Sequence, residues 1–244
     1  MPEPAIIFYF LLIAVAFLYA SVGHGGASGY LALMALFNMS PEVMKPTALI
    51  LNIFVSLIAF LQFYKARHFL WRIFLPLAIA SIPMAFIGGL ITIDQDVYKK
   101  ILGVLLLFAI VRFIGFRKKE PEENKEHSVV IALIIGGVIG LLSGMIGIGG
   151  GIILSPALLL LQWTNQKQTA AISSLFIFVN SLSGFAGQVY KGLQLNSSMY
   201  LLIVLALAGG IAGSYFGARK FNLLILKRVL AAVLMIAVIK LLTI

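Results

Sequence analysis

The sequence contains the glycine run Gly23-His24-Gly25-Gly26-Ala27 in its first half and the run Gly147-Ile148-Gly149-Gly150-Gly151 in its second. A Gln-x-Tyr-Lys motif follows each run, at residues 62–65 and again at residues 188–191. The two glycine runs are 124 residues apart and the two later motifs are 126 residues apart. A duplicated chain with a glycine-broken apolar segment in each half is typical of membrane transporters whose site lies between two repeats.

The composition indicates an integral membrane protein. The sequence is 61% hydrophobic and 11% charged, with a mean hydropathy of +1.09, whereas soluble domains are about 25% charged. The net charge of +10 does not indicate a nucleic-acid partner, because the basic residues form short clusters between apolar runs, as the positive-inside bias produces. The sequence has no cysteine, which excludes disulfides and thiolate metal sites.

Ten apolar runs are predicted to be helices. They lie at 6–22, 26–38, 46–64, 72–92 and 97–115 in the first half, and at 129–145, 149–162, 170–189, 198–217 and 225–243 in the second. Runs of about 20 residues match a bilayer core of roughly 30 Å. The second run of each half follows a glycine run and is too short to span comfortably. The N-terminus lacks the basic region of a signal peptide, so the first run is predicted to be retained.

The predicted fold is an all-α polytopic membrane protein with two inverted repeats, each containing a glycine-broken short helix pair and three spanning helices. The repeats are expected at 1–116 and 128–244, joined by a polar linker at 117–127. If each broken pair, re-entrant or spanning, returns the chain to its starting side, each half crosses an odd number of times and the halves are inverted. A parallel arrangement would require one segment of each half to leave the membrane.

The basic residues divide unequally between the two sides of this topology. Thirteen fall on the side of the linker, and five fall on the other side, namely Lys45, Lys99, Lys100, Lys191 and Lys240. The positive-inside bias therefore predicts a multi-pass protein of the cell inner membrane with a cytoplasmic linker and both termini outside.

The predicted spans favour an anion over a cation as the ligand. Every Asp and Glu lies in a predicted loop or at a terminus, so the spans lack the carboxylates that hold cations or carry protons. The glycine runs instead place free backbone N–H groups and the positive end of a helix dipole near the middle of the membrane. Such helix ends bind anions without a cationic side chain.

Polar residues after each glycine run complete the predicted binding site. The candidate substrate-binding residues are His24, Gly25, Gly26, Ser28, Asn52, Ser56, Gln62, Gly149, Gly150, Gly151, Ser173, Ser174, Asn180, Ser183 and Gln188, and the candidate mouth charges are Lys65 and Lys191. Each type of candidate has a structural alternative. Glycines allow close helix packing, hydroxyls and amides bond between helices, His24 can be a neutral hydrogen-bonded residue, and lysines snorkel from helix ends.

These motifs resemble the sulfite exporter TauE/SafE family over nearly the whole chain. The second half carries Gly-x-Gly-Gly-Gly-x-x-x-x-Pro at 147–156, Ser-Ser-Leu at 173–175 and Asn-Ser-Leu-Ser-Gly at 180–184. The first half carries Gly-His-Gly-Gly at 23–26, Pro-Thr-Ala at 46–48 and Asn52, and departs from the pattern at Ala27 and Ser28. The resemblance implies movement of sulfite, sulfoacetate or related sulfur oxyanions across the bacterial inner membrane.

The expected function is therefore secondary transport of a small sulfur-containing oxyanion, sulfite or an organosulfonate, in the outward direction. The sequence has no Walker A motif for ATP, and we expect no cofactor, no metal and no enzymatic activity. The alternatives are a selective anion channel, a transporter of another small anion, and a membrane enzyme or assembly factor, for which no reactive group of residues is present. The expected partners are the anion and the lipid bilayer, and the sequence leaves a homodimer open.

Overall fold

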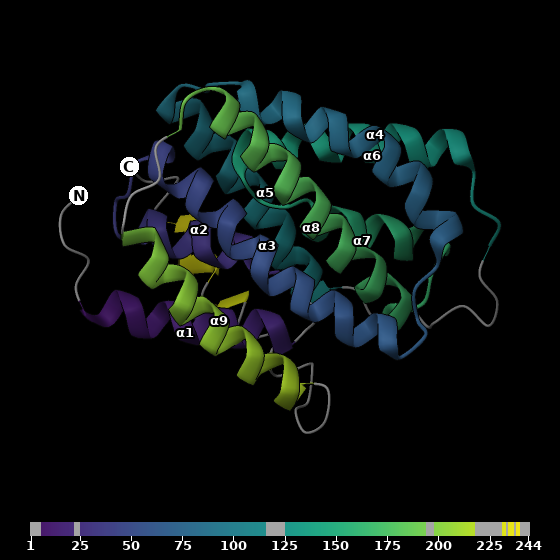
Figure 1. Cartoon of the computed structure of the whole chain (residues 1–244), viewed down its shortest axis with the longest axis horizontal. Helices are drawn as coiled ribbons and strands as arrows, with labels where there is room; N and C mark the ends of the chain where they lie inside the picture. The colour runs from purple at the N-terminus through teal and green to yellow at the C-terminus, as the bar shows by residue number, and fades with distance from the viewer. Residues whose placement is uncertain are drawn as a thin grey trace.

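The computed structural model describes residues 6–21, 25–115, 125–193 and 198–217, together with residues 231–239 except for positions 233 and 237. Within these ranges the chain is a bundle of helices joined by turns (Figure 1). The helices are α1 (Ile6–Ser21), α2 (Ala27–Leu36), α3 (Pro41–Lys65), α4 (Trp71–Leu90), α5 (Gln95–Gly115), α6 (Val129–Ile146), α7 (Gly151–Leu160), α8 (Gln166–Tyr190) and α9 (Ser198–Gly217).

Four of these helices are long and apolar enough to cross a membrane, namely α3, α4, α6 and α8. Shorter apolar helices lie at Ile6–Ser21, Ala27–Leu36, Gly151–Leu160 and Tyr200–Gly213. The predicted all-α polytopic architecture is confirmed at this level for the described residues. The predicted linker and last apolar run fall largely outside them.

Two long helices begin earlier than the apolar runs predict. Helix α3 starts at Pro41 rather than at residue 46, because Ser40 is the N-cap and proline suits the first helical turn. Helix α8 starts at Gln166 rather than at residue 170, because Asn165 and Gln168 form a capping box. The first turn of α8 is polar, and that of α3 contains a proline and a glutamate and is followed by Lys45, so an apolar run does not include them. As one consequence, Lys45 is part of α3.

Glycines bring α4 and α6 into backbone contact. A Cβ added at Gly136 would collide with the carbonyl oxygen of Leu77, and one added at Gly144 would collide with that of Ala85. Small residues at such positions let membrane helices approach closely. Since residue numbers rise together along this interface, α4 and α6 run parallel.

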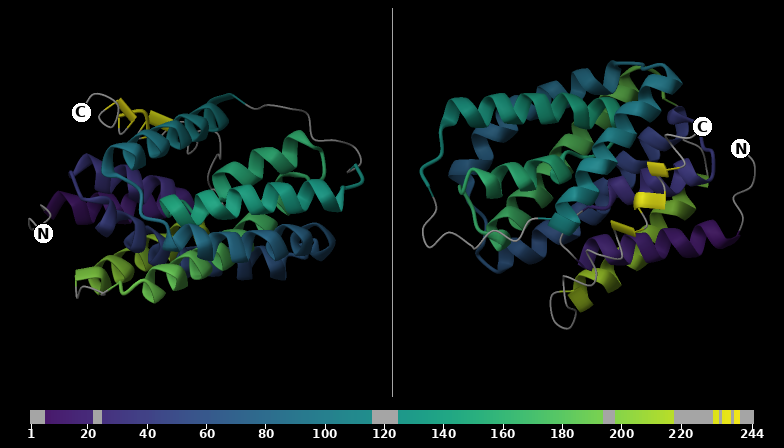
Figure 2. Two further views of the ribbon diagram at one scale, coloured as in Figure 1. Left: turned by 90° about the horizontal axis from the view of Figure 1, so that it is seen from above. Right: turned by 180° about the vertical axis from the view of Figure 1, so that it is seen from behind.

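Helices α1 and α9 pair in the same way. A Cβ at Gly209 would collide with the carbonyl oxygen of Ile13, and one at Gly213 with that of Phe17. These two helices are therefore also parallel, and they lie side by side in all views (Figure 2). Each interface joins a helix of the first half to a helix of the second half.

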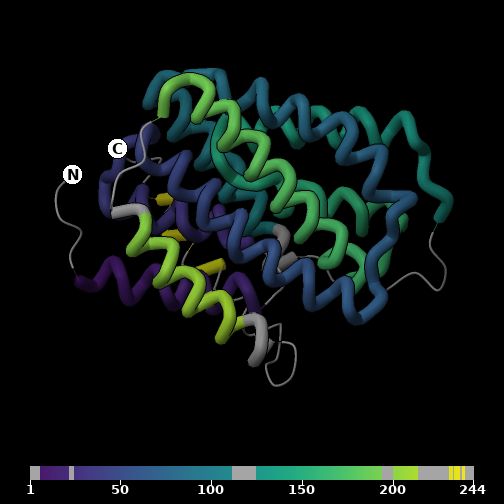
Figure 3. The backbone as a smooth tube through the Cα atoms, in the orientation of Figure 1, coloured from purple at the N-terminus to yellow at the C-terminus, as the bar shows by residue number. Residues whose placement is uncertain are grey.

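The two longest helices, α3 and α8, cross the middle of the bundle side by side and run antiparallel. Asn52 of α3 contacts Ser181 of α8, and a Cβ at Gly184 of α8 would lie 3.7 Å from Leu49 Cδ1 of α3, so residue numbers fall along one helix as they rise along the other. The chain crosses the molecule along α3 and returns along α4 (Figure 3).

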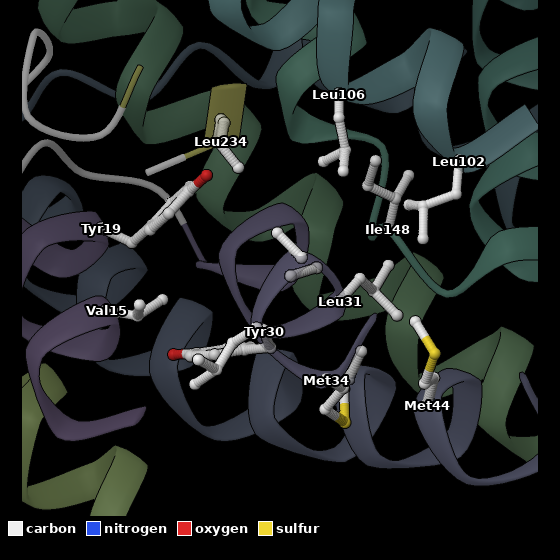
Figure 4. Close-up of a cluster of buried hydrophobic side chains, with 14 of the residues drawn as sticks. Val15, Tyr19, Tyr30, Leu31, Met34, Met44, Leu102, Leu106, Ile148 and Leu234 are labelled. Carbon is white, nitrogen blue, oxygen red and sulfur yellow. The ribbon is translucent and has the colours of Figure 1, made fainter. Parts of the chain in front are cut away.

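The apolar core encloses the short helix α2. Leu31 and Met34 of α2 are buried against α1, α5 and the start of α3. Ile148, from the second glycine run, lies among Leu31, Leu102 and Leu106 (Figure 4). The residue that takes the place of His24 in the second run is thus part of the hydrophobic core.

The α4–α6 interface predicts a position-specific effect of one methyl group. A Cβ at Gly140 would overlap the carbonyl oxygen of Ser81, whereas a Cβ at Gly137, in the same helix, would find its nearest neighbours at 3.9 Å. We expect Gly140→Ala to destabilise the protein by about 1–3 kcal/mol through overpacking. Gly137→Ala should be neutral or stabilising, because alanine is the better helix former.

The measurement is the thermal unfolding midpoint of the two purified variants in detergent, followed by size-exclusion chromatography. Equal midpoints for Gly140→Ala and Gly137→Ala would show that the α4–α6 contact is looser than described.

Candidate functional site

The two short helices α2 and α7 begin at glycines in the left-handed region of backbone space. Gly26, the N-cap of α2, has φ 93°, and Gly150, the N-cap of α7, has φ 76°. Neither helix has a side chain that caps its N-terminus. Because the first turn of a helix has no intrahelical acceptor for its N–H groups, both ends offer backbone donors.

These two helix starts meet at the side chains of Asn52 and Ile177. A Cβ at Gly25 would lie 2.9 Å from Asn52 Oδ1 and 2.9 Å from Ile177 Cγ2. A Cβ at Gly149 would lie 2.5 Å from Asn52 Nδ2 and 2.9 Å from Ile177 Cγ2. The amide of Asn52 is therefore placed between the two glycine segments, with its oxygen toward one and its nitrogen toward the other.

Two serines border the same place. Ser56 lies beside Gly25 and Ser181 beside Gly149, at 3.4 and 3.3 Å from the positions a Cβ would take. The Ser56 hydroxyl donates to the carbonyl of Asn52 at 2.6 Å. We call Gly25, Asn52, Ser56, Gly149, Ile177 and Ser181 the central site.

The amide of Asn52 is fully buried and only partly hydrogen-bonded. Its Nδ2 donates to Ser181 Oγ at 3.4 Å, and its Oδ1 has no partner. Leaving a buried polar atom unpaired is unfavourable, so this atom marks a place where a ligand would be stabilising. The Ser181 hydroxyl can donate as well as accept a hydrogen bond. If the Asn52 amide rotated by half a turn, its Oδ1 could accept from Ser181, and both N–H donors of its Nδ2 would be free for a ligand.

The central site is nearly but not fully symmetric between the two halves. Helices α3 and α8 both have 25 residues and start 125 positions apart. This offset relates Ser56 to Ser181 and Asn52 to Ile177. Asn180, the other candidate asparagine, is not the equivalent of Asn52, because the offset gives that place to Ile177.

Several predicted site residues lie outside the central site and make other hydrogen bonds. The Ser28 hydroxyl donates to the Tyr19 hydroxyl, and the Ser173 hydroxyl shares a hydrogen bond with that of Ser155. Three other candidates donate to backbone carbonyls: Ser174 to Ala171, Asn180 to Phe176 and Ser183 to Ile82. The Nδ2 atom of Asn180 donates to a carbonyl of its own helix, and its Oδ1 is buried without a hydrogen-bond partner.

The remaining candidates lie at the ends of the bundle or outside the described residues. Gln62 and Lys65 are exposed at the end of α3. Gln188 is buried with an unpaired Nε2, and the exposed Lys191 donates to Thr92 Oγ1. Gly151 is the first residue of α7. His24 falls outside the described residues.

Sequence reasoning did not single out Ile177 and Ser181 of the central site, nor Tyr30, which lies next to the start of α2. The first two follow from the 125-residue offset once helix starts are known. The unpaired hydroxyl of Tyr30 lies over Gly26, 2.7 Å from the position of a Cβ, and no sequence signal indicates it. Among the described residues, no group of His, Asp and Glu could hold a metal ion.

Known proteins resemble the chain over most of its length. A probable membrane transporter protein of Sinorhizobium fredii is 36% identical over 96% of this chain and 95% of its own length. Similar descriptions belong to a protein of Bacillus subtilis, 27% identical over 88% of this chain and 91% of its own, and to one of Methanocaldococcus jannaschii, 26% identical over 71% of this chain and 70% of its own. No solved structure matches the chain.

The family model of the sulfite exporter TauE/SafE matches residues 8–241, which include both glycine runs and every residue of the central site. This match and the relatives agree with the multi-pass helical bundle described above. The chain belongs to the sulfite exporter TauE/SafE family of membrane transporters.

Proposed function

We propose that the protein is a secondary transporter that exports a small sulfur-containing oxyanion, sulfite or an organosulfonate, across the bacterial inner membrane. The observation that carries the proposal is the buried, partly unpaired amide of Asn52 between two uncapped helix N-termini. Family membership supplies the substrate class.

The electrostatics of the central site support an anion. Each helix N-terminus is equivalent to about half a positive charge, so the starts of α2 and α7 together favour about one negative charge. The acidic residues of the described chain are Glu42, Asp94, Asp96 and Glu126, which lie at helix starts or in connecting segments. An oxyanion could therefore accept hydrogen bonds from backbone N–H groups and from Asn52 without facing a carboxylate.

We further propose that the two halves are inverted repeats. The lengths of α2 and α7, of α3 and α8, and of α4 and α9 agree pairwise at 10, 25 and 20 residues. If α4 corresponds to α9 and α1 corresponds to α6, the α4–α6 interface of one half-pair corresponds to the α9–α1 interface of the other. Because α3 and α8 are antiparallel, a two-fold axis relating them lies across the helices, in the membrane plane, and passes between Asn52 and Ile177.

The direction of transport follows from the membrane potential. With the inside negative, an anion leaves the cell with a gain of about 2.3 kcal/mol per charge per 100 mV. Export of a singly or doubly charged oxyanion then needs no proton partner, and no carboxylate of the described residues belongs to the central site.

Flux through purified protein in liposomes tests the proposed function. Liposomes loaded with sulfite, sulfate, thiosulfate or an organosulfonate should release sulfite or the sulfonate faster than protein-free liposomes. Release should saturate with concentration and be accelerated by the same anion on the far side. Release that neither saturates nor is accelerated by anion on the far side would indicate a channel, and no release of any of the four anions would contradict the proposal.

The central site predicts different effects for the two buried asparagines. Asn52→Ala should weaken substrate binding by tenfold or more, because a hydrogen bond to a charged group contributes about 1.5–3 kcal/mol. Asn180→Ala should cost less, about 1 kcal/mol, because its nitrogen already bonds to Phe176. Apparent KM values for anion efflux measure both effects. Equal values for Asn52→Ala and the unmodified protein would remove Asn52 from the site.

A glycine pair separates obstruction of the site from backbone strain. Gly149 and Gly192 both have positive φ, of 75° and 96°, but a Cβ at Gly149 would press on Asn52 while one at Gly192 would meet nothing within 4 Å. Gly149→Ala should therefore abolish flux, whereas Gly192→Ala should change only stability. If both variants transported equally well, the approach of the glycine backbone to Asn52 would be unimportant for transport.

The inverted topology predicts opposite locations for the linker and the C-terminus. The chain has no cysteine of its own, so single cysteines can be introduced by Pro121→Cys and Ile244→Cys. A membrane-impermeant thiol reagent added to intact cells should label position 244 and spare position 121. Labelling of both positions from one side would rule out an odd number of crossings in the second half.

A further inference from the structure

Lys45 is a buried cation at the end of the bundle where α3 begins and α4 ends. Its side chain is 9% exposed. The ammonium donates to the carbonyl oxygens of Gly88, Gly89 and Ile91 at 3.2–3.3 Å. All three partners are neutral, and the exposed Glu42, three residues earlier in α3, is not among them. Because neutral carbonyls do not compensate a charge, the Lys45 ammonium keeps its full positive charge although water reaches little of the side chain.

Gln188 lies at the same level on the neighbouring helix. The antiparallel α3–α8 pair aligns Asn52 with Ser181 and Leu49 with Gly184, and this register continues to Lys45 and Gln188. The Gln188 side chain is 8% exposed, and its Nε2 has no hydrogen-bond partner. The register therefore places an unused, buried amide donor at the level of the Lys45 ammonium, whose hydrogen-bond partners are carbonyl oxygens rather than a carboxylate.

Lys191 adds a second positive charge to this group. It follows Gln188 by three residues at the end of α8, and its ammonium donates to Thr92 Oγ1. Thr92 directly follows Ile91, whose carbonyl binds Lys45. Two ammonium groups are thus held at consecutive residues of the segment that leaves α4. An anion close to these two ammonium groups would be attracted to both of them.

The second glycine run connects this group to the central site. A Cβ at Gly147 would lie 3.0 Å from the carbonyl oxygen of Lys45, and one at Gly149 would reach Asn52. Lys45 and Asn52 are seven residues apart in one helix, which corresponds to roughly 10 Å. An anion released by Asn52 toward this end of the bundle would meet the Lys45 group next.

We propose that Lys45, Gln188 and Lys191 form a second anion-binding site, the mouth site, where the transported oxyanion stops between the central site and the water. The inference rests on the proposed function. The two ammonium groups bind the charge, and the amide of Gln188 donates to an oxygen. The segment around residues 88–92 holds both lysines in place.

The lysine of the proposed mouth site has no equivalent in the second half. The 125-residue offset between α3 and α8 places Ala170 at the position equivalent to Lys45. Among the described residues, the start of α8 therefore lacks the buried lysine that the start of α3 has. By the distribution of basic residues, the mouth site faces outward, so an exporter would use it as the last stop before release.

A purely structural role for Lys45 makes a different prediction. The ammonium could serve only as a cap for the C-terminal carbonyls of α4, where a cation is stabilising. Loss of a cap would lower stability and would reduce transport from both faces alike. Loss of a binding site would raise the apparent KM only for anions that arrive from the Lys45 face.

The experiment compares the two faces of the same protein in liposomes. Protein is reconstituted in one orientation, and uptake of labelled sulfite is measured against concentration with the Lys45 face outside or inside. We expect Lys45→Gln and Gln188→Leu to raise the apparent KM from the Lys45 face by about tenfold, the loss of one hydrogen bond to a charged group. The KM from the opposite face should stay within twofold. Lys45→Arg, which keeps the charge, should restore most of the affinity.

Lys100→Gln is the matched control, because Lys100 is an exposed lysine near the start of α5. It removes the same charge from the same end of the molecule without touching Gln188 or Lys191. We expect its KM to be unchanged from both faces. An equal rise for Lys100→Gln and Lys45→Gln would reduce the mouth site to a general surface-charge effect and overturn the inference.

Binding measured without transport separates this inference from the proposed function. Titration of the purified protein in detergent with sulfite should show weaker binding for Lys45→Gln and Gln188→Leu than for Lys100→Gln. If the unmodified protein binds sulfite in this way but no anion crosses the liposomes, the proposed function fails and the mouth site stands. If sulfite binding or the KM is the same in all three variants, the mouth site is wrong whether or not transport occurs.

Discussion

The structure depends on one constraint, the satisfaction of backbone polar groups in the absence of water. Inside a bilayer, a helix can be interrupted only where the freed N–H and C=O groups face protein or ligand rather than lipid. Of the described residues, Gly25 just before α2 and Gly149 just before α7 both lie against Asn52 and Ile177. In the proposed transporter, the N–H donors of these helix starts are available to the anion, so the breaks and the central site are one feature.

Glycine serves this constraint in two separate ways. At Gly26, Gly149 and Gly150 it permits a positive φ, which starts a helix in the interior without a capping side chain. At positions such as Gly136 and Gly144 it has ordinary helical geometry and lets carbonyl groups of the next helix approach. The second use brings the backbones of the α4–α6 and α1–α9 pairs into close contact. The α3–α8 pair, which carries the central site, lies between them.

The sequence predicts the helices and the location of the breaks because both follow from local properties, namely apolar length and glycine content. The partners of each polar side chain depend on helix register, which hydropathy does not report. Asn180 illustrates the difference. Its residue type matches Asn52, but its position in α8 corresponds to Val55, and its amide binds the carbonyl of Phe176. Lys45 shows the same limit, since the proline and glutamate of the first turn hid its place within α3.

The departures from symmetry indicate how two similar halves could perform different tasks. An exact repeat would place two amides on the axis and a buried lysine at each end. The chain instead pairs Asn52 with Ile177, and Lys45 with Ala170. The backbone donors are shared by both halves, so they provide attraction for an anion from either direction. In the proposed transport path, the side chains that differ make the two routes to the centre unequal, since the described residues place a buried lysine on one of them. Equal halves would give the two faces of the proposed transporter equal affinity for the anion, and the lysine at one end would make those affinities differ.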